Sequence, residues 1–350
     1  MFGPGTGDPP RLSICIATFN RATLLAITIE SILPQLSEAV ELVVVDGASP
    51  DETEAVLAAA ATRSPYVRYE RLQQKGGVDQ DFCRAVEVAR GAYCWLFCDD
   101  DRLEPGAVGR VLREIEAGYS LVIVNARVMD RELAETLSED LLGGARDQVI
   151  HGDQLDILFS RIVPYVSFIG SVVIRRDLWR QREKEAYFGT EFVHVGVIFQ
   201  EMIPGDVKIV SERLVTIRYG NAQWAPRASE IWLLKWPRLI WSFSNVSERA
   251  KRAKDNPGSW KCLQSLVLYR ALGSYGLPTY RKLMSWRRVS PWWRSCALLI
   301  AVLPQALMRA LCLAYFRVLG RGSPLDIYDL AGPPALREPM PRGSRRTEEE

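Results

Sequence analysis

Three adjacent carboxylates, Asp99, Asp100 and Asp101, directly follow the apolar run 93–98. An apolar, aromatic run of this length that ends in polar residues is typical of an interior strand of a parallel sheet. Because successive side chains of a strand point to opposite faces, we expect Asp99 and Asp101 on one side and Asp100 pointing away. Three neighbouring carboxylates also repel one another unless a cation lies among them.

A divalent metal that holds a diphosphate is the natural cation for these aspartates. Mg²⁺ and Mn²⁺ prefer oxygen ligands and bridge phosphates with only one or two protein carboxylates. The alternative is an acidic turn that caps the following helix. The aspartates by themselves leave both interpretations open.

Further polar residues lie where other predicted strands end. Strands are predicted at 12–20, 41–46 and 66–72, and helices follow the first two and the loop 75–79. This alternation predicts a parallel, doubly wound α/β sheet, whose ligands bind beyond the carboxyl ends of its strands. The residues expected at that edge are Thr18, Asn20, Asp46, Asp79 and the three aspartates. Their convergence favours the metal–nucleotide interpretation.

The helix after the second strand has a clear start signal. Ser49 is the predicted N-cap, Pro50 the first helical residue and Glu52 the partner that completes a capping box. No GxGxxG follows the first strand and no GxxxxGK[ST] occurs, so dinucleotide binding and P-loop phosphate transfer are disfavoured.

Composition indicates an ordinary globular chain. The 350 residues are 48% hydrophobic and 25% charged, with a formal net charge of +2. The seven cysteines are scattered and odd in number, which is typical of reduced thiols in a cytosolic protein. Residues 1–10 contain no apolar segment of the kind found in a signal peptide.

Three ordered segments give the chain a family resemblance. Ala-Thr-Phe-Asn-Arg at 17–21, the segment 45–53 and Trp-Leu-Phe-Cys-Asp-Asp-Asp at 95–101 resemble the signatures of family 2 glycosyltransferases with the GT-A fold. The spacing of 77–81 and of 89–93 is similar to the abequosyltransferase-like branch. The ordered set is specific, although no single motif is.

The resemblance, which spans roughly residues 12–224, implies an inverting transfer from a nucleotide-diphosphate sugar with Mn²⁺ or Mg²⁺. Asp46 would accept from the nucleobase, Asp99 would meet the ribose or sugar, and Asp99 and Asp101 would be the metal ligands. The other donor-binding residues expected are Thr18, Asn20, Arg21, Asp79 and Arg218. Phe82 and Cys83 stand where many relatives have Arg-Asn, so donor contacts there would come from Asp79 or Asp81.

The general base is expected near residues 188–194, where relatives carry an acidic pair at a helix start. An inverting transfer needs a base that takes the proton of the acceptor hydroxyl. Because Phe192 stands at the second acid, Glu191 is the first choice and His194 the second. The alternative for His194 is a packed, hydrogen-bonded core residue.

Arg218 begins a polar, aromatic segment at 218–224 that could close over the donor. An arginine there would neutralise the leaving diphosphate. The alternative is an ordinary surface turn.

Beyond residue 231 the chain becomes rich in Trp, Lys and Arg on helical segments. The apolar runs 296–303 and 306–319 are too short to span a bilayer, and Arg309 and Arg317 interrupt the second. A helix lying in the headgroup region fits this composition. The basic residues that would meet anionic lipid are Arg281, Lys282, Arg287, Arg288 and Arg294. The alternative is a soluble helical subdomain.

These observations predict four parts: a disordered N-terminus at 1–10, a GT-A domain at 11–230, a helical, basic and amphipathic extension at 231–330 and a disordered tail at 331–350. The predicted function is a metal-dependent glycosyltransferase at the cytoplasmic face of the cell membrane. It would act on a lipid-linked saccharide in surface polysaccharide or O-antigen synthesis, with no nucleic-acid partner. The alternatives are a degenerate nucleotide-sugar-binding scaffold at the membrane and, outside glycosyl transfer, a nucleotidyltransferase.

Overall fold

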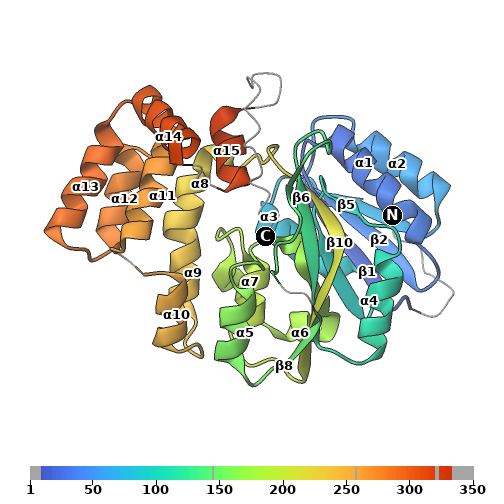
Figure 1. The fold of residues 1–350 in the computed structure, drawn as a ribbon. Helices are drawn as coiled ribbons and strands as arrows, with labels where there is room; N and C mark the ends of the chain where they lie inside the picture. The colour runs from blue at the N-terminus through green and yellow to red at the C-terminus, as the bar shows by residue number, and fades with distance from the viewer. Residues whose placement is uncertain (1–8, 144–145, 257, 320–322, 333–350) are drawn as a thin grey trace, which may run out of the picture. The chain divides into compact units, whose positions relative to one another are not determined.

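The structure is a computed structural model that describes residues 9–143, 146–256, 258–319 and 323–332 (Figure 1). The chain divides into two units: residues up to 219 together with 230–257 form the first, and 220–229 together with residues from 258 onward form the second. The sequence places its domain boundary at 230 instead. Residues 231–257 group with the first unit because Ile231, Leu239 and Phe243 belong to its apolar core. The predicted tails at 1–10 and 331–350 lie almost wholly outside the described residues.

A mixed sheet in the order β3-β2-β1-β4-β9-β6-β10-β5 forms the centre of the first unit. The strands β1, β2, β3 and β4 are mutually parallel, as the strand–helix alternation predicts. Strand β9 is antiparallel to both β4 and β6, and β10 is parallel to β6. The strands are β1 (Leu12–Thr18), β2 (Val40–Asp46), β3 (Val67–Arg71), β4 (Tyr93–Phe97), β5 (Arg102–Leu103), β6 (Leu121–Met129), β7 (Thr136–Ser138), β8 (Gln148–His151), β9 (Val172–Arg175) and β10 (Asp206–Arg218).

Helices cover both faces of this sheet, because successive strand residues alternate between two apolar cores. Ile14 and Val44 pack with α1, α2 and α4, whereas Cys15 and Val43 pack with α3, α5 and α7. The helices of the first unit are α1 (Ala22–Ile32), α2 (Thr53–Arg63), α3 (Val78–Val88), α4 (Ala107–Glu116), α5 (Leu155–Ile162), α6 (Arg176–Gln181), α7 (Val193–Phe199), α9 (Trp236–Ser242) and α10 (Glu248–Lys254). A π-helical turn, η5 (Ile231–Lys235), precedes α9.

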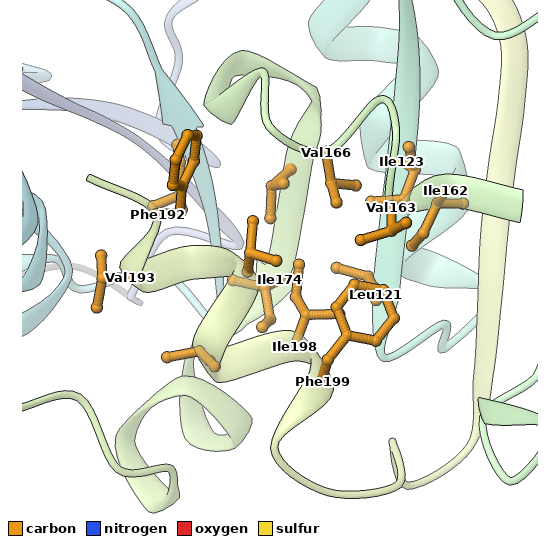
Figure 2. Packing of buried hydrophobic residues seen from close by; sticks show 14 of the residues in the cluster. Leu121, Ile123, Ile162, Val163, Val166, Ile174, Phe192, Val193, Ile198 and Phe199 are labelled. Carbon is orange, nitrogen blue, oxygen red and sulfur yellow. The ribbon is translucent and has the colours of Figure 1, made fainter. Parts of the chain in front are cut away.

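Helix α7 is anchored in the second of these cores. Figure 2 shows Ile198 and Phe199 of α7 beside Leu121 and Ile174 of the sheet. Every residue of α7 is buried. The segment that leads into α7, which contains Glu191, is therefore attached to a rigid element.

The predicted capping box at the start of α2 is wrong. Helix α2 begins at Thr53, because Ser49 is buried and occupied elsewhere. The Ser49 amide donates to Asp46 Oδ1 at 2.9 Å, and Ser49 Oγ accepts from the Asn20 amide at 2.8 Å. Asp51 serves the helix start instead, since its Oδ1 accepts from the Thr53 amide at 3.2 Å.

Helix α3 begins earlier than expected. The sequence places Asp79 in a loop before a helix at 80–90, but the helix starts at Val78, directly after Gly77 with φ +106°. Both Asp79 and Asp81 therefore lie in its first turn.

The second unit is helical. Its helices are α11 (Trp260–Ala271), α12 (Leu277–Trp286), α13 (Pro291–Val302), α14 (Gln305–Leu319) and α15 (Pro324–Ala331), and α8 (Ala228–Glu230) lies at the junction of the units. Ala271, Met308, Cys312 and Leu330 form a buried cluster among them. Among the described residues, no one helix has the length and apolar character to cross a bilayer. Helices α13 and α14 meet that test only together, and a break bends them by 106°.

Candidate active site

The carboxyl ends of β1 and β4 meet at the aspartate cluster. Thr18 Oγ1 donates to Asp99 Oδ2 at 2.7 Å, and Arg21 Nη1 donates to Asp99 Oδ1 at 3.2 Å. The same guanidinium forms an ion pair with Asp100. Thr18 and Arg21, both expected to bind the donor, are thus hydrogen-bonded to Asp99, a third residue of that set.

The prediction that Asp100 points away from its neighbours is wrong. Strand β4 ends at Phe97 and the chain bends at 99–100, so the alternation of a strand does not continue through the aspartates. One carboxylate oxygen each of Asp100 and Asp101 and the Sγ atom of Cys98 lie within 4.8 Å of one another. This grouping differs from the predicted metal pair of Asp99 and Asp101.

Asp101 is buried and held from β10. Its Oδ1 accepts from the Arg218 amide at 3.0 Å, while the Arg218 guanidinium donates to the carbonyls of Asp100 at 3.2 Å and Arg131 at 2.8 Å. Arg218 is the last residue of β10 and is itself buried, so it does not lie on a surface turn. Its contacts fix the backbone of the aspartate segment.

The aspartate cluster suits a cation. Burial, followed by the charge of Asp100, raises the pKa of Asp99 to about 6 against the opposing effect of Arg21. Burial and the charge of Asp100 also raise the pKa of Asp101 well above its ordinary value. Carboxylate oxygens are the ligands that Mg²⁺ and Mn²⁺ prefer, and a divalent charge would relieve this repulsion. The donor set of Asp100 and Asp101 therefore fits such an ion, and Asp99 as a ligand stays a prediction.

Asp46 lies buried at the end of β2 with one oxygen engaged. Its Oδ1 accepts from the Ser49 amide, whereas Oδ2 has no hydrogen-bond partner among the described residues. The nearest cation is Arg71, with Nε 3.9 Å from Oδ2. A buried acceptor left unsatisfied costs about 1–3 kcal/mol, and such groups are typical of binding sites. Asn20, close by through Ser49, has a φ of +56°, a strained conformation that is frequent at functional sites.

Asp79 positions the chain around the candidate base. Its two oxygens accept from the amides of Glu191 at 2.9 Å and Val193 at 3.0 Å, at the start of α7. Burial raises its pKa against these two hydrogen bonds. Both oxygens are thus occupied, and the expected direct contact of Asp79 with a donor gains no support from this arrangement.

Glu191 adopts a φ of +71°, which is rare for a residue with a side chain. Its Oε1 accepts from Lys235 Nζ at 2.8 Å. Lys235 ends the π-helical turn η5, and such turns occur frequently at functional sites. Phe192, which replaces the second acid of the family, is buried with its ring centroid 4.7 Å from that of Trp236. Phe192 packs in the apolar core, whereas the neighbouring Glu191 is only partly buried.

His194 is a core residue. It is 1% exposed, and its Nε2 lies 2.8 Å from the Val166 carbonyl, to which it donates. Burial lowers the pKa of His194 to about 4. This is the packed histidine that the sequence left as the alternative, so we retain Glu191 as the candidate base.

Sequence reasoning missed Lys235, Asp100 and Cys98. Lys235 lies 44 residues after Glu191 in a Trp-rich segment without a motif, so only the fold brings the two together. Asp100 was excluded by an alternation that the bend interrupts. Cys98 was missed because scattered cysteines predict only reduced thiols.

Solved structures share this fold. The chain matches S. aureus TarS residues 1–349 in complex with UDP with a TM-score of 0.52 and 14% identity, over 69% of this chain and 68% of that one. The mixed sheet, covered on both faces by helices, is the GT-A fold of the glycosyltransferases, which confirms the predicted fold class. Membrane association of the extension is not part of that match and stays a prediction.

Sequence comparison gives the family. Residues 13–176 match the model of glycosyl transferase family 2. The chain is 25% identical over 264 residues to the abequosyltransferase RfbV of Salmonella typhimurium, covering 70% of this chain and 79% of that protein. It is 27% identical over 183 residues to the GalNAc(5)-diNAcBac-PP-undecaprenol beta-1,3-glucosyltransferase of Campylobacter jejuni. This match covers 52% of this chain and 57% of that protein. This match confirms the resemblance to family 2 glycosyltransferases that the three signatures predict.

Proposed function

We propose that this chain transfers a sugar, with inversion, from a nucleotide-diphosphate donor to a hydroxyl of a lipid-linked saccharide in surface polysaccharide or O-antigen synthesis. The observation that carries this is the convergence of Thr18, Arg21 and the three aspartates at the ends of β1 and β4. The acceptor class follows from the Campylobacter relative, whose name gives an undecaprenol-linked saccharide.

In this proposal the donor lies along the edge formed by β2, β1 and β4. Asp46 Oδ2 accepts from the nucleobase, and Asp99, oriented by Thr18 and Arg21, accepts from the ribose or the sugar. Asp100 and Asp101, with Asp99 as the predicted further ligand, would hold Mn²⁺ or Mg²⁺. When bound, such an ion would supply positive charge beside the leaving diphosphate.

Glu191 then acts as the general base. Its carboxylate takes the proton of the acceptor hydroxyl while that oxygen bonds to the anomeric carbon, and the bond from this carbon to the diphosphate oxygen breaks with its electron pair. Attack from the face opposite the nucleotide inverts the configuration. The ion pair with Lys235 and the hydrogen bond from the Glu191 amide to Asp79 orient the base.

We expect the chain to bind a nucleoside diphosphate in a metal-dependent way, and thermal unfolding tests this. Thermal unfolding of the full chain is measured with UDP, CDP, GDP and dTDP, each with and without Mn²⁺. A ligand at 100 times its Kd stabilises the folded state by about 2.7 kcal/mol, which raises the midpoint by several degrees. No shift with any nucleotide would contradict a donor site.

We further propose that the second unit contacts the inner surface of the cell membrane. Five apolar side chains of α13 and α14 are more than half exposed: Trp292, Leu299, Val302, Leu311 and Val318. The exposed arginines Arg294, Arg309 and Arg317 accompany them. An apolar surface flanked by cations is suited to anionic headgroups. Arg287, expected to meet lipid, is instead buried with its guanidinium over Trp286.

Charge placed on this apolar surface should release the protein from vesicles. In the double variant Leu299→Asp and Val302→Asp, both positions are exposed, so folding is retained while the apolar contact with lipid is lost. We expect severalfold less co-sedimentation with anionic phosphatidylglycerol vesicles than for the wild type. Ile157→Asp, on the equally exposed Ile157 of α5, is the matched control and should sediment like the wild type. Equal sedimentation of the double variant would remove the membrane proposal.

A further inference from the structure

Two buried carboxylates lie close together at the carboxyl end of β2. Asp46 ends that strand and Asp81 lies in the first turn of α3, and both are at most 3% exposed. Each keeps one oxygen, Asp46 Oδ2 and Asp81 Oδ1, without a hydrogen-bond partner among the described residues. Two neighbouring buried carboxylates, each with an acceptor-only oxygen that lacks a partner, favour a ligand that brings hydrogen-bond donors.

The protonation of Asp81 reflects this crowding. Burial, and to a lesser extent the charge of Asp46, raise the pKa of Asp81 to about 6. The amides of Gly76 and Gly77 and the ammonium of Lys75 oppose this rise. Asp81 is therefore mostly ionised at pH 7, next to a second carboxylate.

Two glycines bring the backbone up against Asp81. A Cβ atom on Gly47 would lie 2.9 Å from Asp81 Oδ2, and one on Gly76 would lie 2.7 Å from Asp81 Oδ1. Both distances are shorter than real Cβ contacts. Any larger residue in either loop would displace the Asp81 carboxylate, so the two loops are shaped around it.

An aromatic face lies beside the same carboxylate. The Cβ position of Gly47 is 3.7 Å from Cδ2 of Phe19, which places the ring next to the loop that touches Asp81. The exposed Lys75 covers this ring, with Nζ 3.6 Å from its centroid. A planar ligand can take the place of this flexible side chain over Phe19, since side-chain rearrangement on binding is common.

We propose that Asp46 and Asp81 together select a nucleobase that carries an exocyclic amino group, namely cytosine, adenine or guanine, against uracil and thymine. This inference rests on the proposed function and specifies its donor. Amino groups of bases donate hydrogen bonds, and carboxylates accept them from cytosine N4. Uracil and thymine present one N–H between two carbonyl oxygens, and a second carboxylate facing such an oxygen repels it.

The amide variant of Asp81 gives the sharpest test. Isothermal titration of the full chain with CDP, ADP, GDP, UDP and dTDP in Mn²⁺ should show at least one amino-bearing nucleotide binding about tenfold or more tightly than UDP and dTDP, the effect of one mismatched hydrogen-bond pair. Asp81→Asn keeps the size of the side chain and adds an N–H donor that suits a carbonyl oxygen. We expect it to lose this preference and to gain UDP binding, while Asp177→Asn, at an exposed aspartate, keeps the preference.

Each outcome separates this inference from the function on which it rests. Binding of UDP or dTDP as tight as that of the best amino-bearing nucleotide overturns the base selection and leaves a donor site standing. A preference that Asp81→Asn does not change, in a variant with an unchanged unfolding midpoint, removes Asp81 from base selection. Binding of no nucleotide at all contradicts the proposed function itself.

Discussion

Glu191→Gln should lower the rate of sugar transfer by about 10²–10⁴-fold while leaving nucleotide binding unchanged, because a positioned general base contributes a factor of that size. Glutamine has the shape of glutamate but cannot take the acceptor proton. Its backbone amide still donates to Asp79, so the segment before α7 keeps its conformation. The measurement is the release of nucleoside diphosphate from a panel of nucleotide sugars with lipid-linked saccharide as acceptor, alongside the thermal shift by the nucleotide alone.

The chain offers matched controls for this substitution. Glu185 is an exposed glutamate six residues earlier, and Glu185→Gln should transfer at the wild-type rate. Lys235→Met removes the ion pair that orients Glu191 and should lower kcat more than it raises KM, whereas Lys235→Arg should restore much of the rate. A Glu191→Gln enzyme with the full rate of transfer would show that the base lies elsewhere.

Asp101→Asn should weaken the binding of Mn²⁺ by more than about 100-fold, since even residues that only support a metal ligand cost 10–100-fold when replaced. The asparagine keeps an oxygen for the Arg218 amide, so the link between the aspartate segment and β10 is preserved. Loss of the negative charge removes the main attraction for a divalent ion. Electron paramagnetic resonance of free Mn²⁺ gives the affinity directly, without a known sugar or acceptor.

The same variant separates the metal site from the acidic-turn interpretation. If the aspartates only capped the next helix, Asp101→Asn would leave both Mn²⁺ affinity and the metal-dependent shift by nucleotides unchanged. Asp177→Asn removes one exposed carboxylate at α6 and controls for the change in net charge. Its Mn²⁺ affinity should equal that of the wild type.

The fold could be predicted from the sequence because its first half is built of local signals. Strands β1, β2 and β4 are short apolar runs, and helices with apolar faces separate the strands. The order of the strands beyond β4 had no such signal. Strand β9 inserts antiparallel between β4 and β6, and its residues pair with residues 49 or more positions away along the chain, beyond the reach of periodicity.

In the candidate site too, local sequence signals predict some residues, whereas others depend on contacts between distant segments. Residues within one motif, such as Thr18 and Arg21 or the three aspartates, were found because the motif is contiguous. The direction of Asp100 was missed because the chain bends at 99–100, where Asp100 pairs with Arg21, and the pleat of the strand does not continue. Lys235 was missed because its contact with Glu191 joins segments 44 residues apart. Contiguous motifs thus identify residue types that can bind metal and nucleotide, and tertiary contacts decide which of these residues lie together in the site.

The first turn of α3 also limits which insertions the chain can tolerate. Asp79 and Asp81 lie two residues apart in this turn. Asp79 accepts from the amides at the start of α7, and Asp81 lies against the loops that contain Gly47 and Gly76. One residue added between them would rotate Asp81 by about 100° around the helix and break its fit with both loops. Homologous chains that keep both acids should therefore keep their separation, whatever the length of the loop before Gly76.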